Sequence, residues 1–139
     1  MEKSQSMPLG GIIRIRRVFK TRHFSRWMRK TELTDTALCA AVQEMALGLI
    51  DADLGGGLVK KRVGIAGRGK RGGARTLVAM SKHSSWFFVF GFEKNERANI
   101  DADELEALQE LAAQLLMRTN EELALAVVDG ALKEICHGY

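Results

Sequence analysis

The sequence predicts an α+β domain built on a four-stranded sheet that is antiparallel except at its N-terminal strand. Three observations support this class: segments that alternate apolar and polar residues, segments with apolar residues at helical spacing, and short connections between the last three strands. Short connections favour an antiparallel meander. We therefore expect two N-terminal helices on one face of the sheet, part of the other face open, and further helices at the C-terminus.

The N-terminal part of the chain predicts a leader, one strand and two helices. Residues 1–11 are mainly polar and hold the single proline, so we expect a flexible leader. Residues 12–19 alternate imperfectly between apolar and basic side chains, which is typical of a half-buried strand. Thr21 can cap a short helix, and Thr34 or Asp35 begins a second. The second helix has its apolar stripe at Leu38, Val42, Met45 and Leu49.

Three more strands are expected in the middle of the chain. Residues 58–65 and 75–80 have the composition of strands and flank a glycine-rich basic loop. Residues 86–90 are apolar on both faces, which favours a central strand.

Two capping-box pairs predict the C-terminal helices. Asp101 with Glu104 begins one helix, and Thr119 with Glu122 begins another. The last helix is expected to run through Ile135, although Gly130 is a plausible break.

The chain of 139 residues fits one domain, which we place at residues 12–118, with residues 119–139 as its helical extension. No segment approaches the ~20 apolar residues that a membrane span needs, and the N-terminus lacks the apolar run of a signal peptide. We therefore expect a cytoplasmic protein without a membrane partner.

The cysteines and histidines predict neither a metal site nor a cofactor. Cys39 and Cys136 match no metal or redox spacing, and the three histidines are scattered along the chain. Two buried free thiols in a reducing compartment are the expectation.

The charge is distributed unevenly. Residues 1–98 hold 19 bases and 8 acids, a net of +11, whereas residues 99–139 hold 2 bases and 9 acids, a net of −7. The most concentrated basic segment, residues 60–75, contains seven Lys or Arg residues, five glycines and no acid. Like charges at this density repel one another, and a nucleic-acid backbone would compensate them.

Strand geometry sorts these basic residues by face. Because alternate residues of a strand share a face, Lys60 and Arg62 point the same way and Lys61 points to the other side. In a meander, Arg75 lies across from the end of the first strand, and Lys94 follows the last one. We therefore expect Lys60, Arg62, Arg75 and Lys94 on one concave face.

Such a cluster could cleave RNA through the 2′-hydroxyl of the strand itself. The reaction needs a base for the 2′ proton, cations that stabilise the phosphorane, and an acid for the leaving 5′-oxygen. A lysine crowded by cations loses its proton more readily and could serve as the base. The glycines would let Arg68, Lys70 and Arg71 approach phosphates closely.

Three segments, residues 60–63, 67–75 and 92–97, carry a resemblance to a known family. With their GRGKRGGAR and FEKNER sequences, they resemble the core of the RelE/HigB toxins in the RelE/ParE superfamily of type II toxin–antitoxin systems, over roughly residues 17–118. The resemblance implies the RelE-like microbial ribonuclease fold and a bacterial toxin that cleaves mRNA in the ribosomal A site. It also implies a small antitoxin, which we expect to be a helix-turn-helix protein from the adjacent gene, and operator DNA bound only by the toxin–antitoxin complex.

The resemblance also suggests roles for individual residues. Lys60 and Arg62 match the basic pair of the family's second strand, and Arg75 matches its phosphate-stabilising arginine. Lys94 and Asn95 fall where RelE-type toxins have a Lys-Arg pair, so Asn95 replaces the arginine that often acts as the acid, and Lys94 becomes the candidate. Arg68, Lys70, Arg71 and Asn95 are the expected RNA-binding residues.

Two alternatives remain open from the sequence. One is a ParE-like toxin of the same fold that attacks gyrase. The other is a catalytically weak nucleic-acid-binding module that acts with an antitoxin as a transcriptional repressor, and the loss of the usual arginine at Asn95 keeps this alternative open.

Overall fold

A computed structural model describes residues 17–81 and 84–137 of the chain. The expected leader at residues 1–11 and the first part of the expected N-terminal strand lie outside these residues. The elements, in chain order, are β2 (Val18–Thr21), α1 (Arg22–Met28), α2 (Asp35–Ala46), β3 (Ala52–Gly55), β4 (Leu58–Ile65), β5 (Gly69–Ala79), β6 (Trp86–Glu93), α3 (Ala102–Leu116), α4 (Asn120–Val128) and β7 (Leu132–Ile135).

The α+β class is confirmed, but the expected number of strands is wrong. Within the described residues the sheet has six strands in the order β3-β4-β5-β6-β2-β7. β4, β5 and β6 form the antiparallel meander, and β2 pairs in parallel with β6, so the sheet is mixed as expected. The two additional strands, β3 and β7, have four residues each and form the edges.

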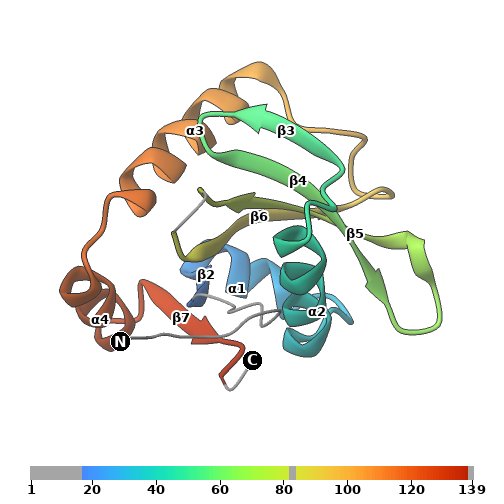
Figure 1. Ribbon diagram of the computed structural model, residues 1–139. Helices are drawn as coiled ribbons and strands as arrows, with labels where there is room; N and C mark the ends of the chain where they lie inside the picture. Colours follow the sequence, from blue (N-terminus) through green and yellow to red (C-terminus); the bar gives the residue numbers. More distant parts are fainter. Residues whose placement is uncertain (1–16, 82–83, 138–139) are drawn as a thin grey trace, which may run out of the picture.

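Helices cover both faces of the sheet (Figure 1). One core lies under α1 and α2 and includes Phe24, Leu38 and Phe88. The second core lies under α3 and α4 and includes Phe87 and Leu115. The same strands supply both cores because successive residues of a strand point to opposite faces.

The helix boundaries follow the capping signals. Thr21 and Thr34 cap α1 and α2, and complete capping boxes begin α3 and α4. The expectation of a helix through Ile135 is wrong, because α4 ends at Val128 and the chain returns to the sheet as β7. Gly130 permits this reversal with a positive φ of 84°.

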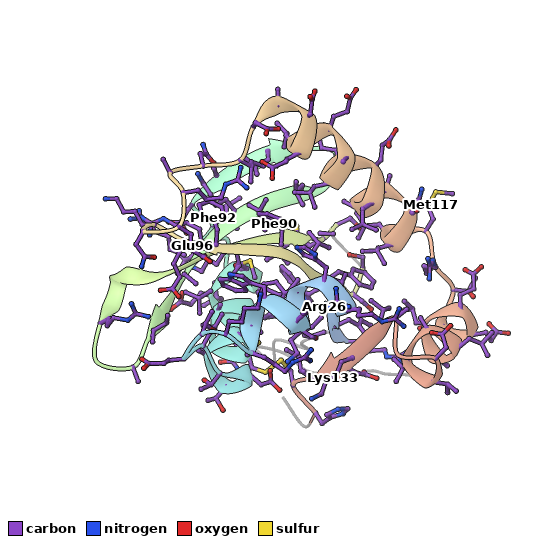
Figure 2. All side chains as sticks on the ribbon, turned by 180° about the vertical axis from the view of Figure 1, so that it is seen from behind. Arg26, Phe90, Phe92, Glu96, Met117 and Lys133 are labelled. Carbon is purple, nitrogen blue, oxygen red and sulfur yellow. A yellow bond between two sulfur atoms is a disulfide. The ribbon has the colours of Figure 1, made fainter. Side chains whose placement is uncertain are left out.

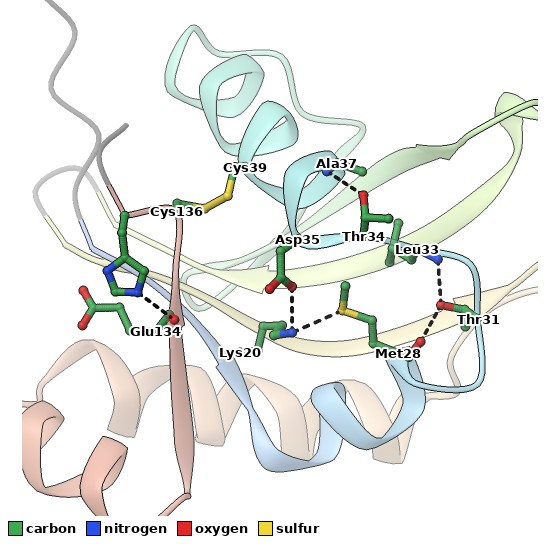
Figure 3. Close-up of polar contacts among 11 residues, drawn as sticks. Lys20, Met28, Thr31, Leu33, Thr34, Asp35, Ala37, Cys39, Glu134 and Cys136 are labelled. Carbon is green, nitrogen blue, oxygen red and sulfur yellow. Dashed lines mark hydrogen bonds and ion pairs between the residues drawn. A yellow bond between two sulfur atoms is a disulfide. The ribbon is translucent and has the colours of Figure 1, made fainter.

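A disulfide replaces the two free thiols expected from the sequence. Cys39 of α2 is bonded to Cys136, directly after β7, with Cα atoms 5.5 Å apart (Figure 3). An ion pair between Arg17 and Glu134 (2.8 Å) also fixes β7 and, mainly through its hydrogen bonds, lowers the pKa of Glu134. The cysteines are 97 residues apart, so only the fold brings them together.

Loss of the disulfide should destabilise the protein. Cross-linking restricts the unfolded chain, and a loop of this length contributes about 2–5 kcal/mol. We expect dithiothreitol, or Cys39→Ser combined with Cys136→Ser, to lower the free energy of unfolding in urea by about that amount. The double variant serves as the control, since dithiothreitol should leave it unchanged. Equal wild-type stability with and without reductant would contradict this role.

Candidate active site

Lys60, Arg62 and Arg75 line one hollow on the face of the sheet opposite to α2. Antiparallel pairing of β4 with β5 places Arg62 directly across from Arg75, and Lys60 lies two residues away from Arg62 on the same face. The hollow has a volume of about 300 Å³, and its remaining walls are formed by Asp51, Ala52 and Ala98. The structure therefore brings together three of the four cations expected to act in catalysis.

Arg75 has an unused hydrogen-bond donor. Its Nη1 atom is buried and has no hydrogen-bond partner within the described part of the chain. A buried guanidinium nitrogen without an acceptor is costly to the folded state, so this arginine is not held in place for stability alone. The neighbouring Arg62 guanidinium is partly restrained, with its Nε atom 3.4 Å from Oδ1 of Asp51.

Lys61 points to the opposite face, as predicted, and is an anchor for α2. Its side chain is 5 % exposed. The Nζ atom donates to the carbonyl oxygen of Leu49 (2.8 Å) and forms an ion pair with Glu44 (2.8 Å). These contacts tie the end of α2 and the segment after it to β4. Lys61 is thus part of the structural core beneath the cationic face.

The glycine-rich hairpin between β4 and β5 projects from the body of the fold (Figure 1). Gly73 is required by backbone packing, because a Cβ at this position would overlap the carbonyl oxygen of Val63. Arg68 is held by an ion pair with Glu93 of β6 (3.1 Å). The side chains of Lys70 and Arg71 lie outside the described part of the structure, so their RNA-binding role stays a prediction.

Lys94 and Asn95 are exposed on the turn after β6, and they line a second hollow. This hollow has a volume of about 430 Å³ and also includes Arg68 and Glu93. The register explains why Lys94 is separated from Arg75. Phe92 pairs with Arg75, Glu93 pairs with Ala74, and β6 ends at Glu93. Lys94 therefore does not line the hollow of Arg75, contrary to the arrangement expected from the sequence.

The acidic residues of the 93–97 turn have structural contacts. Oε1 of Glu96 accepts hydrogen bonds from the backbone N–H of Glu93 (2.6 Å) and the indole N–H of Trp27 (3.2 Å). Arg97 forms a two-pronged ion pair with Glu104 of α3. These contacts fix the ends of the turn that presents Lys94 and Asn95.

The aromatic side chains of β6 belong mainly to the packing. Phe92 is 2 % exposed and Phe90 stacks against His23 of α1 with ring centroids 5.5 Å apart. Figure 2 shows Phe90 and Phe92 following one another along the strand. Gly91 between them leaves room for the ring of Trp27, which a Cβ would overlap.

The sequence did not indicate Asp51 or Ala98 as residues of the site. Asp51 precedes a strand too short to be recognised, and Ala98 lies in the connection to α3. No group of three or more His, Cys, Asp or Glu side chains that could hold a metal ion occurs among the described residues. None of the described helices has the length and apolar character that a membrane span requires.

A mixed sheet that carries a compact cationic hollow defines an α+β protein able to hold an anion such as a phosphate. Residues 16–135 match the family model described as the RelE toxin of the RelE/RelB toxin–antitoxin system. The chain therefore belongs to the RelE toxin family, whose members are toxins with an antitoxin partner and are generally ribonucleases. No curated protein matches the sequence significantly.

Substitution of Lys61 should lower stability more than substitution of its neighbour Lys60. Lys61→Met leaves the carbonyl of Leu49 without its buried donor, so we expect a loss of about 1–3 kcal/mol in the free energy of unfolding, measured in urea. Lys60→Met is the matched control on the adjacent position of β4 and should change stability by less than about 1 kcal/mol. Equal losses in the two variants would contradict the anchoring role of Lys61.

The ion pair between Arg97 and Glu104 should stabilise the fold only above acidic pH. The hydrogen bond from Arg97 lowers the pKa of Glu104 below its ordinary value. The contribution is therefore complete above that ordinary value and is lost as the pH falls through the lowered, folded-state pKa. We expect Glu104→Gln to lower the urea midpoint at pH 7, and the difference from wild type to shrink as the solution is acidified.

Glu106→Gln provides the control for this pH series. Glu106 is on the same helix and has no ion pair among the described residues. Its substitution should leave the midpoint nearly unchanged at every pH. A Glu104→Gln deficit that persisted at the lowest pH would show that the lost contact is not ionic.

Proposed function

We propose that this chain is an endoribonuclease toxin that cleaves mRNA on the ribosome and thereby inhibits translation. The observation that carries the proposal is the hollow that Lys60, Arg62 and Arg75 line together. Membership of the RelE toxin family supports the same reaction class. Three cations around a hollow of this size suit a single phosphodiester group.

The proposed reaction is an attack by the 2′-oxygen of the RNA on the adjacent phosphorus. Lys60 accepts the 2′ proton, and the P–O5′ bond breaks to leave a cyclic phosphate and a free 5′-hydroxyl. Arg62 and Arg75 bind the non-bridging oxygens, where charge accumulates in the transition state. A solvent molecule supplies the proton to the departing 5′-oxygen, because Lys94, the acid expected from the sequence, lines a different hollow. The cations of the chain provide the charge stabilisation, so this mechanism requires no metal or cofactor.

The remaining residues and partners complete the proposal. Arg68, Lys70, Arg71 and Asn95 contact the RNA on either side of the scissile phosphate, where basic groups position the strand. The antitoxin is a helix-turn-helix protein from the adjacent gene, and operator DNA is bound only by the toxin–antitoxin complex. The toxin acts in the bacterial cytoplasm, where translating ribosomes present its substrate.

Cleavage should depend individually on the three cations of the hollow. We expect Lys60→Met, Arg62→Gln and Arg75→Gln each to reduce cleavage of ribosome-bound mRNA by about 100-fold or more, because each removes a group that acts in the transition state. Primer extension on the mRNA measures the cuts. Lys133→Met is the matched control, since Lys133 is an exposed lysine on β7, well away from Phe92 and the end of β6 (Figure 2).

Other outcomes would favour the alternative functions. Intact mRNA together with a DNA-damage response after induction would indicate a gyrase-directed toxin. Unimpaired growth with operator binding in the presence of the antitoxin would indicate a repressor module, an alternative that the Asn95 replacement leaves open. Wild-type cleavage by the variants would exclude the assigned hollow as the catalytic site.

A further inference from the structure

Asp51 is the one carboxylate among the described residues that line the hollow of Lys60, Arg62 and Arg75. Two hydrogen bonds to the backbone of β4 fix its position directly before β3. Its N–H donates to the carbonyl oxygen of Lys60 (2.9 Å), and its Oδ2 accepts from the N–H of Arg62 (2.6 Å). The carboxylate thus lies against the part of β4 whose side chains enter the hollow.

The second oxygen of Asp51 restrains the guanidinium of Arg62. Oδ1 lies 3.4 Å from Nε, a longer separation than the roughly 2.8 Å of a strong charge-assisted hydrogen bond. The Arg62 side chain remains 46 % exposed, so an incoming anion can still reach it. The contact therefore limits the orientation of Arg62 without occupying all of its donors.

We propose that Asp51 is a positioning residue of the RNA-cleaving site, which aims Arg62 into the hollow and offsets part of the positive charge there before RNA binds. Three cations facing one another repel, and a carboxylate fixed by the backbone reduces this repulsion. The inference rests on the proposed function, since it assigns Asp51 a part in the same reaction.

Asp51 then has opposite effects on binding and on cleavage. Its negative charge repels the phosphate, so its neutralisation should strengthen RNA binding. Its contact with Arg62 keeps the guanidinium oriented for the phosphorane, so its neutralisation should slow the chemical step. A purely structural residue would weaken both properties together.

Asp51→Asn tests this split because the amide oxygen can still accept the hydrogen bond from the N–H of Arg62. One measurement is the Kd for an oligoribonucleotide with 2′-O-methyl groups at every position, which cannot be cleaved. The other is the single-turnover rate on ribosome-bound mRNA. We expect the Kd to fall about threefold to tenfold and the rate to fall about tenfold.

Asp53→Asn is the matched control. Asp53 lies two residues further on, accepts a hydrogen bond from the N–H of Gly55 (2.9 Å), and does not line the hollow. This variant loses the same charge and should leave the Kd and the rate close to wild type. Urea unfolding of both variants verifies that they are folded.

A double variant tests whether Asp51 acts through Arg62. With Arg62→Gln already present, Asp51→Asn should not slow cleavage further. The proposal is overturned if Asp51→Asn changes the Kd and the cleavage rate no more than Asp53→Asn does. It is also overturned if Asp51→Asn weakens RNA binding and slows cleavage together. If wild-type protein leaves mRNA intact, the proposed function fails, while the Kd comparison still decides whether Asp51 offsets the charge of the hollow.

Discussion

The antiparallel pairing of β4 with β5 is the constraint on which the rest of the site depends. Its register sets Arg62 across from Arg75 and keeps Lys60 on the same face. A shift of one residue would exchange the two faces of a strand. Lys61 would then enter the hollow, and α2 would lose its anchor on β4. The same backbone bonds therefore define both the cationic face and the core beneath it.

The distribution of carboxylates distinguishes two kinds of basic residue in this protein. Cations that hold elements together have ion-pair partners, whereas Lys60 has none among the described residues and Arg75 retains an unpartnered nitrogen. An unpaired cation in a hollow reduces stability and gains free energy when an anion binds. The paired cations that hold elements together, with their partners, are Arg17 with Glu134, Lys20 with Asp35, Lys61 with Glu44, Arg68 with Glu93, and Arg97 with Glu104. Arg62 lines the hollow and has a longer contact, 3.4 Å, with Asp51.

Local signals in the sequence predicted much of the fold, and long-range contacts account for what they missed. Strand-like composition placed β4, and the capping boxes placed the starts of α3 and α4. The edge strands β3 and β7 are too short for a periodic pattern and exist because neighbouring strands supply their partners. Lys60, Arg62 and Arg75 could be grouped by strand geometry alone. Asp51, the separate hollow of Lys94 and the disulfide all depend on tertiary structure.

The disulfide and Lys61 together attach α2 to both sides of the sheet. Lys61 fastens the end of the helix to β4, near one edge, while Cys39 in its middle is bonded to the residue that follows β7, the opposite edge. In the strand order, β5, β6 and β2 lie between these two attachments. A single helix thus ties the strand that carries Lys60 and Arg62 to the far side of the sheet. Reduction of the disulfide would remove one of these two attachments of α2 and leave the one at Lys61 in place.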